Sequence, residues 1–231
     1  MSPVPRPSPN HDERGADPVD ILVLHYTGMG TAEEALSRLC DPAAKVSAHY
    51  TVDRDGTVYA HVPEERRAWH AGLSYWAGVR NVNARSIGIE IVNPGHELGY
   101  IPFTDDQVGA VIDLACGILK RHPVPPRNVV AHSDVAPSRK QDPGELFPWG
   151  RLAEYGIGLW PPSAARMGVV AQTAAEATFR ERLTRYGYDP DVPPADAVAA
   201  FQRHFRPSRI DGVADGECAS LLDGLMAHPR S

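Results

Sequence analysis

A continuous apolar run at residues 21–24 (Ile-Leu-Val-Leu) is the feature that most limits what this chain can fold into. The run is apolar on both faces of an extended strand, which is typical of a central strand covered on both sides. It ends at His25, and a shorter apolar segment, 129–131, ends in the same way at His132. Strands of this kind, mixed with amphipathic helices, predict an α/β fold in which a mixed β-sheet is flanked by helices.

Helix and hairpin signals lie between those strands. Capping boxes at residues 31–34 and 104–107, each a Thr followed three positions later by Glu or Gln, predict the first turns of two helices. The second box precedes apolar residues at helical spacing as far as Leu119. Residues 46–52 and 57–62 flank an Asp-Arg-Asp-Gly turn and predict a β-hairpin.

Residues 86–92 predict a further strand with two unlike faces. Isoleucines at every second position share one face, whereas Gly88 and Glu90 share the other. A lone glutamate in an alternating strand usually faces solvent. Glu90 therefore becomes a candidate functional residue only in the company of other reactive groups.

The pattern of the chain changes near residue 157, where strand signals stop. Residues 1–19 are rich in proline and polar side chains and predict a disordered or loosely draped tail. Residues 173–231 contain three helical patterns, which predict a small all-α module near the lower size limit for independent folding. We therefore expect a main domain over 20–158, a linker over 159–172 and a helical domain over 173–231.

Composition disfavours several classes of protein. The 231 residues contain no stretch of about 18 apolar residues, which a membrane-spanning helix needs. The net charge of −6 disfavours nucleic acid as a partner, because such proteins neutralise phosphates with basic side chains. Three cysteines without a Cys-x-x-Cys pair give neither a disulfide framework nor a thiolate zinc site. Because no signal peptide or lipoprotein cysteine is visible, we expect a cytoplasmic monomer, and a periplasmic protein only if the N-terminus is mis-assigned.

Five polar residues carry the chemistry that the sequence suggests. Two histidines at strand ends, His25 and His132, and the carboxylate of Asp142 match a zinc site that keeps one position open for water. Glu90 has the chemistry to move a proton from that water to a leaving amine. Lys140, two residues before Asp142, has the charge to stabilise an oxyanion. Such a set suits the hydrolysis of an amide, but spacing alone does not bring His25 and His132 together.

Several stretches of the chain resemble the zinc-dependent N-acetylmuramoyl-L-alanine amidases of the Amidase_2 family, which share the fold of peptidoglycan recognition proteins. The most specific stretch is Ala136-Pro-Ser-Arg-Lys140-Gln-Asp142-Pro-Gly144. Together the matching stretches span most of residues 20–158. The others are ILVLHYT at 21–27, SAHY at 47–50, AWHAG at 68–72, SIGIE at 86–90 and VVAH at 129–132.

The resemblance implies a role for each of the five reactive residues. One zinc ion per chain would be held by His25, His132 and Asp142. Glu90 would be the general base and acid, and Lys140 would be the partner of the oxyanion. The substrate would be peptidoglycan or a soluble muropeptide, cleaved between N-acetylmuramic acid and L-alanine in cell-wall turnover or recycling.

The resemblance also implies substrate contacts. Tyr26 and Thr27 would line the substrate groove, and Trp69 and His70 would form part of its wall, although a core aromatic is an equal interpretation of Trp69. His49 is expected to have a structural role beside the site. The remaining histidines are expected on the surface: His11, His61, His96, His122, His204 and His228.

The C-terminal helices resemble a small peptidoglycan-binding domain, on the strength of Arg185-Tyr-Gly-Tyr188 and residues 199–207. The same pairing of domains occurs in outer-membrane lipoproteins of the family, whose lipid signal is not visible in this sequence, whereas the cytoplasmic relatives usually lack the second domain. The helices either bind the glycan polymer or only stabilise the main domain. Two other functions stay open, a non-catalytic peptidoglycan-recognition module and a zinc peptidase that cuts within the stem peptide.

Overall fold

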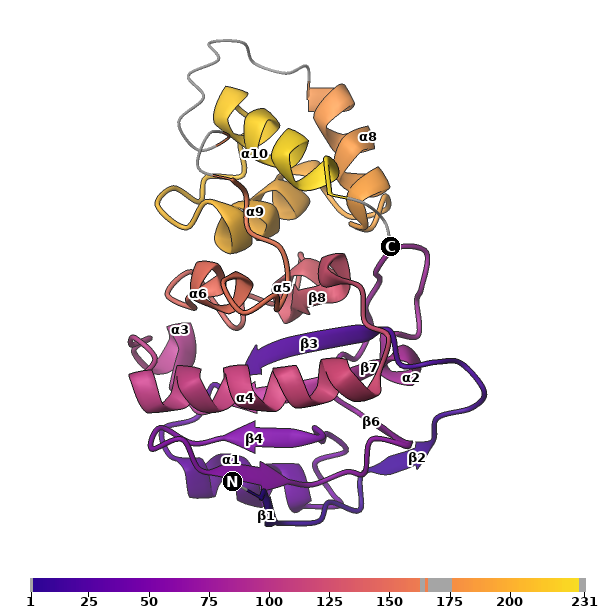
Figure 1. Cartoon of the computed structure of the whole chain (residues 1–231), viewed down its shortest axis with the longest axis vertical. Coiled ribbons are helices and arrows are strands. Elements are labelled where there is room, and N and C mark those ends of the chain that lie inside the picture. Colours follow the sequence, from indigo (N-terminus) through magenta and orange to yellow (C-terminus); the bar gives the residue numbers. More distant parts are fainter. Residues whose placement is uncertain (1, 163–164, 166–175, 229–231) are drawn as a thin grey trace.

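The structure, a computed structural model, describes residues 2–162, 165 and 176–228 and has an α/β architecture (Figure 1). Its main sheet has six strands in the order β1-β5-β4-β7-β3-β8. The four neighbouring strands β4, β7, β3 and β8 are parallel to one another, whereas β5 pairs antiparallel with β4. The predicted mixed sheet is therefore confirmed. The strands are β1 (Val4–Pro5), β3 (Ile21–Tyr26), β4 (Tyr50–Val52), β5 (Val58–Ala60), β7 (Ser86–Ile91) and β8 (Val129–Ala131), with β2 (His11–Glu13) and β6 (Arg66–Ala68) in a second sheet.

Strand β3 is buried on both faces, as its apolar run predicts. Leu22 and Leu24 pack in the cluster under one helix, whereas Ile21 and Val23 pack on the opposite side with residues of the C-terminal helices. His25 follows in the same alternation and therefore shares the face of Ile21 and Val23. The strand that organises the core thus also presents a histidine on the face that the C-terminal helices cover.

Helix α4 (Asp105–Arg121) lies across the other face of the sheet (Figure 1). Its apolar residues pack against Ile87, Ile89 and Ile91 of β7. Thr31 and Glu34 form the complete predicted capping box. Thr104 accepts from the Gln107 backbone, but the Gln107 side chain donates to the Val92 carbonyl instead of completing the second box. The first helix is α1 (Ala32–Cys40), and the shorter ones are α2 (Val82–Arg85), α3 (Gly95–Leu98), η1 (Pro126–Asn128), α5 (His132–Val135) and α6 (Trp149–Ala153).

The N-terminal tail is not disordered, and this corrects the expectation drawn from its composition. Strand β1 pairs with β5, and β2 pairs with β6. Arg14 is buried and donates hydrogen bonds to five backbone carbonyls, those of Glu64, Arg66, Asn83, Ala84 and Ser86. One buried guanidinium therefore ties the tail to several segments of the main domain, which composition does not reveal.

The C-terminal module contains three helices, α8 (Glu176–Tyr186), α9 (Pro194–Phe205) and α10 (Gly216–Met226). They correspond to the three helical patterns of the sequence, and the predicted start at 173 lies outside the described residues, as does most of the 159–172 linker. The module is not merely tethered, because Trp76 and Tyr188 join its apolar core to Ile21 and Val23 of β3 in one cluster. The domain boundaries themselves stay a prediction.

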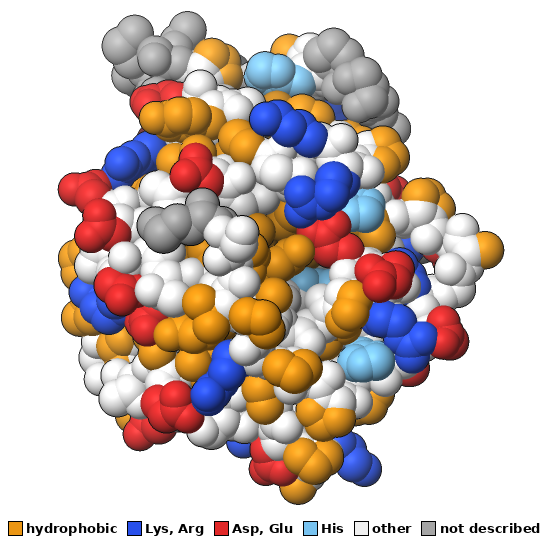
Figure 2. All heavy atoms as spheres, turned by 60° about the horizontal axis from the view of Figure 1, so that its bottom comes forward, with side chains coloured by type: hydrophobic (Ala, Val, Ile, Leu, Met, Phe, Trp, Pro, Cys, Tyr) orange, Lys and Arg blue, Asp and Glu red, His pale blue; other side chains and the backbone are white. Residues whose placement is uncertain are grey.

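In the described ranges, no helix is both long and apolar enough to cross a membrane. On the face shown in Figure 2, acidic and basic side chains are interspersed among apolar ones, around a hollow that contains histidine. Charge of one sign does not gather there into a broad patch.

Candidate active site

The register of three parallel strands brings together the residues at their carboxyl ends. In β3 and β8, Leu24 is paired with Ala131, so His25 and His132 follow at the same edge of the sheet. In β3 and β7, His25 is paired directly with Glu90. Neighbouring residues of parallel strands point to the same face, so this register explains why residues more than a hundred positions apart meet.

Asp142 enters the same site from a turn that follows α5. The backbone N–H of Ser133 donates to the Asp142 carbonyl at 3.0 Å, and the Tyr100 hydroxyl donates to the Pro143 carbonyl at 2.6 Å. Gly144 has a φ of +89°, and a Cβ at this position would collide with the Tyr100 hydroxyl. Glycine is therefore needed to turn the chain where Asp142 is presented.

The three predicted ligands converge. His25 Nδ1 lies 2.9 Å from His132 Nδ1 and 3.1 Å from Asp142 Oδ2, and His132 Nδ1 lies 3.0 Å from the same oxygen. Zinc bonds of about 2.0–2.2 Å at tetrahedral angles separate ligand atoms by about 3.4 Å. The cluster is the one group of three or more His, Cys, Asp or Glu side chains in the described part of the chain that is arranged to hold a metal ion.

The protonation of the two imidazoles suits a metal. His132 Nε2 lies 3.2 Å from the Ala71 carbonyl, which can only accept, so the proton sits on Nε2 and the Nδ1 lone pair faces the cluster. Burial, aided by the nearby His132, lowers the pKa of His25 to about 4, so this imidazole is neutral at neutral pH. Neutral histidine is the form that binds metal ions. The residues present therefore fit a zinc ion.

Glu90 has the properties of a proton-transfer group. Burial, and next the charge of Asp142, raises the pKa of its carboxyl group well above the usual range, although Lys140 opposes this. Its Oε2 is buried without a hydrogen-bond partner among the described residues. An unpaired buried carboxylate oxygen is costly, and such groups concentrate at functional sites.

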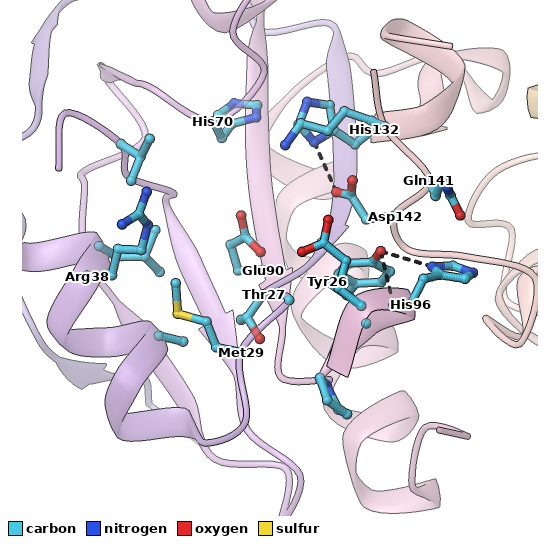
Figure 3. Close-up of a pocket in the computed structure, with 18 of the residues that line it drawn as sticks. Tyr26, Thr27, Met29, Arg38, His70, Glu90, His96, His132, Gln141 and Asp142 are labelled. Atoms are coloured by element: carbon cyan, nitrogen blue, oxygen red, sulfur yellow. Dashed lines mark hydrogen bonds and ion pairs between the residues drawn. The ribbon is translucent and has the colours of Figure 1, made fainter. Parts of the chain in front are cut away.

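The site opens into a cavity of about 370 Å³ that contains Glu90, His132, Lys140 and Asp142. Figure 3 shows Arg38 and Met29 on one side of it and His96 and Gln141 on the other. Lys140 is half-buried, and no hydrogen bond or ion pair engages its ammonium group within the residues that the structure describes. A cation without a local partner is available to a ligand.

Comparison with known proteins decides the family. The Amidase_2 family, described as N-acetylmuramoyl-L-alanine amidase, matches residues 15–145. The chain belongs to this amidase family. The match covers five of the six strands of the main sheet, helices α1 to α5 and all five reactive residues.

Among its relatives, the amidase resembles AmiD of Escherichia coli, named an N-acetylmuramoyl-L-alanine amidase, at 40% identity over 90% of this chain and 82% of AmiD. The AmiD structure in complex with the substrate anhydro-N-acetylmuramic acid-L-Ala-D-gamma-Glu-L-Lys superposes with a TM-score of 0.82 at 39% identity, covering 92% of this chain and 90% of that one. AmpDh3 of Pseudomonas aeruginosa with anhydromuramic pentapeptide gives 0.80 at 36% identity, covering 92% and 91%. The 1,6-anhydro-N-acetylmuramyl-L-alanine amidase AmpD of Enterobacter cloacae is 36% identical over 63% of this chain and 86% of AmpD.

The four predicted substrate contacts all line the cavity of this amidase. Tyr26 and Thr27 follow the first ligand, and Trp69 is half-buried in the wall rather than in the core. His70 is 92% buried and lies 3.0 Å, through Nδ1, from His25 Nε2. The His70 side chain therefore contacts the predicted metal ligand His25, and only a small part of it faces the cavity.

Two of the histidines expected on the surface are buried. His61 lies 2.8 Å from Thr51 Oγ1, and His204 lies 2.6 Å from Asp134 Oδ2. His96 is half-buried in the cavity wall and lies 2.9 Å from the Tyr26 hydroxyl. These roles depend on contacts between distant segments, and no local pattern in the sequence indicates them.

Proposed function

We propose that the amidase binds one zinc ion through His25, His132 and Asp142 and hydrolyses the amide between N-acetylmuramic acid and L-alanine. The convergence of three buried ligand atoms at 2.9–3.1 Å carries the proposal. When bound, zinc supplies Lewis acidity, which lowers the pKa of water to about 7 and polarises a carbonyl.

Glu90 is the general base and then the general acid. Its unpaired Oε2 is free to accept a proton from the attacking water. It then passes this proton to the departing L-alanine amine. Its position beside His25 in the register keeps this proton transfer next to the metal ligands.

Lys140 stabilises the negative charge that develops on the carbonyl oxygen. Its ammonium group stands two residues from Asp142 in the cavity wall, with no described partner to neutralise it. A pre-positioned cation in a partly dry site is worth more than one in water. Tyr26, Thr27 and Trp69 line the same cavity and contact the bound substrate.

Two relatives support the choice of substrate class. AmiD and AmpDh3 have been crystallised with anhydro-muropeptides, and this chain covers about nine-tenths of each. We therefore assign soluble anhydro-muropeptides as a substrate. The presence of the complete ligand set disfavours a non-catalytic recognition module.

The substitution Glu90→Gln tests the mechanism. It keeps the size of the side chain and removes its basicity, so we expect an unchanged zinc content and a loss of about 10²–10⁴-fold in kcat on an anhydro-muropeptide. Product masses from the unmodified enzyme should correspond to the free stem peptide and the free sugar. Full activity of the variant would remove Glu90 from the base role, and a cut within the peptide would favour the zinc peptidase.

We further propose that helices α8 to α10 bind peptidoglycan. The resemblance of Arg185-Tyr-Gly-Tyr188 and residues 199–207 to a small peptidoglycan-binding domain supports this. The test is sedimentation of the Glu90→Gln chain with intact sacculi while excess anhydro-muropeptide fills the active site. Retention on the sacculi is expected, and complete release would leave the helices a stabilising role only.

A further inference from the structure

We propose that His70 and Ser86 are positioning residues that fix His25 in the one tautomer able to bind the metal. This inference rests on the proposed function, because it concerns a ligand of the proposed zinc ion. His70 is otherwise expected only as part of the groove wall, and Ser86 is outside every predicted role. The argument follows three buried hydrogen bonds that link the Val82 carbonyl, Ser86, His70 and the predicted ligand His25, and we call this series of contacts the relay.

The chain begins at a backbone carbonyl. Ser86 Oγ lies 2.7 Å from the carbonyl oxygen of Val82, which can only accept, so the hydroxyl proton is donated there. Ser86 Oγ also lies 3.1 Å from His70 Nε2. With its single proton committed, the hydroxyl must accept from His70 Nε2–H. His70 therefore keeps its lone pair on Nδ1.

The chain then reaches the ligand. His70 Nδ1 lies 3.0 Å from His25 Nε2, so His25 must donate its Nε2 proton to it. The lone pair of His25 is consequently on Nδ1, which faces His132 Nδ1 and Asp142 Oδ2. With the opposite tautomer, a proton would occupy the place of the metal ion. Ser86, His70 and His25 are each at least 92% buried, so water does not compete for these contacts.

Strand β7 is built to hold this chain. Ser86, Gly88 and Glu90 alternate onto the same face of the strand. A Cβ at Gly88 would lie 2.5 Å from His70 Cγ, so only glycine leaves room for the imidazole ring over the strand. One face of β7 therefore carries Ser86, where the relay begins, Gly88, which leaves space for the His70 ring, and Glu90, the proposed base.

The segment that carries His70 orients both imidazole ligands. His70 acts on His25 through its side chain, and the next residue, Ala71, acts on His132 through its carbonyl at 3.2 Å. The side-chain oxygen of Asn83 accepts from the backbone N–H groups of both residues, at 3.2 and 2.8 Å. The short Trp-His-Ala-Gly stretch thus orients two metal ligands. This role explains its place next to the site better than a contribution to the groove wall does.

Zinc affinity of the full chain, measured by competition with a chromogenic chelator, tests the relay. His70→Leu removes the acceptor for His25 Nε2–H, and we expect a loss of about 10–100-fold in affinity. His70→Asn is the matched control, because its amide oxygen can occupy the place of Nδ1 and accept the same proton. We expect this variant to recover most of the affinity, which a loss of packing alone would not allow.

Nitrogen-15 spectra of the histidines in metal-free protein provide a readout independent of activity. His25 should be protonated on Nε2 in the natural chain and in His70→Asn, and should become a mixture of tautomers in His70→Leu. Ser86→Ala, which keeps the ring, is a milder second variant, with an expected loss of up to about 10-fold in zinc affinity.

The outcomes separate the two proposals. A natural chain that binds no zinc would overturn the proposed function. A natural chain that binds zinc, with unchanged affinity and tautomer in both His70→Leu and Ser86→Ala, would overturn the relay alone. A raised KM in His70→Leu with unchanged zinc affinity would return His70 to the groove wall.

Discussion

The short helix α5 separates two buried clusters of histidine and carboxylate that differ in one respect. At its first residue, His132 meets His25 and Asp142. The atoms that face one another are the Nδ1 atoms of both histidines and Asp142 Oδ2, and all three are acceptors when each imidazole carries its proton on Nε2. Two residues on, Asp134 accepts from the Tyr188 hydroxyl and from His204 Nδ1, each at 2.6 Å. In the first cluster the facing acceptors suit a metal cation. In the second, donors meet both oxygens of the Asp134 carboxylate, and His204 Nε2 is buried without a hydrogen-bond partner in the described part of the chain.

The comparison teaches that residue type and burial do not distinguish a metal site from a structural network. What distinguishes them is whether donors face the carboxylate, as at Asp134, or further acceptors do, as at Asp142. Asp134 also accepts the Ala131 backbone N–H at 2.8 Å, and His204 is stacked between Trp149 and Phe205 with ring centroids 3.8 Å from each. This cluster therefore joins the C-terminal module to the helix that carries a ligand.

The largest expected effect on stability is at Asp134. Asp134→Ala leaves the buried donors of Tyr188 and His204 unpaired, and we expect a loss of about 3–5 kcal/mol in the free energy of unfolding. Asp142→Ala, the matched change in the other cluster, should reduce the stability of the metal-free chain by less. Urea unfolding of both metal-free variants measures this, and equal losses would contradict the distinction between the two clusters.

A smaller effect is expected from Tyr188→Phe. This change removes one hydroxyl that donates to a carboxylate and leaves the ring in place, so the free energy of unfolding should fall by about 1.5–3 kcal/mol. Zinc content and kcat should stay near those of the natural chain, because the ligands keep their own contacts. Loss of zinc in this variant would mean that the two clusters are not separable.

The smallest effect concerns a third, half-buried cluster. Burial would raise the pKa of Glu64, but hydrogen bonds from Arg121, His122 and Tyr50 outweigh it and lower the pKa to about 2 from an ordinary 4.5. A lowered pKa contributes stability above about pH 4.5, and this contribution is lost as the pH falls towards 2.

We expect Glu64→Gln to remove about 1–2 kcal/mol of that acid-dependent stability, a figure reduced for solvent screening. Unfolding curves of both proteins between pH 6 and 2 provide the measurement. Their free energies should converge as the pH falls, and a constant difference across the range would show that Glu64 contributes no such linkage.

Local patterns predicted the elements that carry the site. The apolar run before His25, the alternation around Glu90 and the capping box at Thr31 each appear in the structure where the sequence places them. These features depend on neighbours within a few residues, so a single sequence contains them. The pairing of His25 with His132 came from resemblance, because it depends on strand register.

The sequence did not predict the contacts made by single polar side chains across the fold. Arg14 holds a proline-rich tail that composition alone marks as disordered. His204 is buried because Asp134 and two aromatic rings meet it from other elements. Ser86 acquires its place in the relay only when His70 is folded over Gly88.

Titration of the metal-free full chain with zinc tests the central claim most directly. We expect one zinc ion per natural chain and a loss of this stoichiometric binding in His132→Ala and Asp142→Ala, while Tyr188→Phe keeps it. Binding of no zinc by the natural chain, or equal binding by all four proteins, would contradict the assignment of His25, His132 and Asp142 as the metal site.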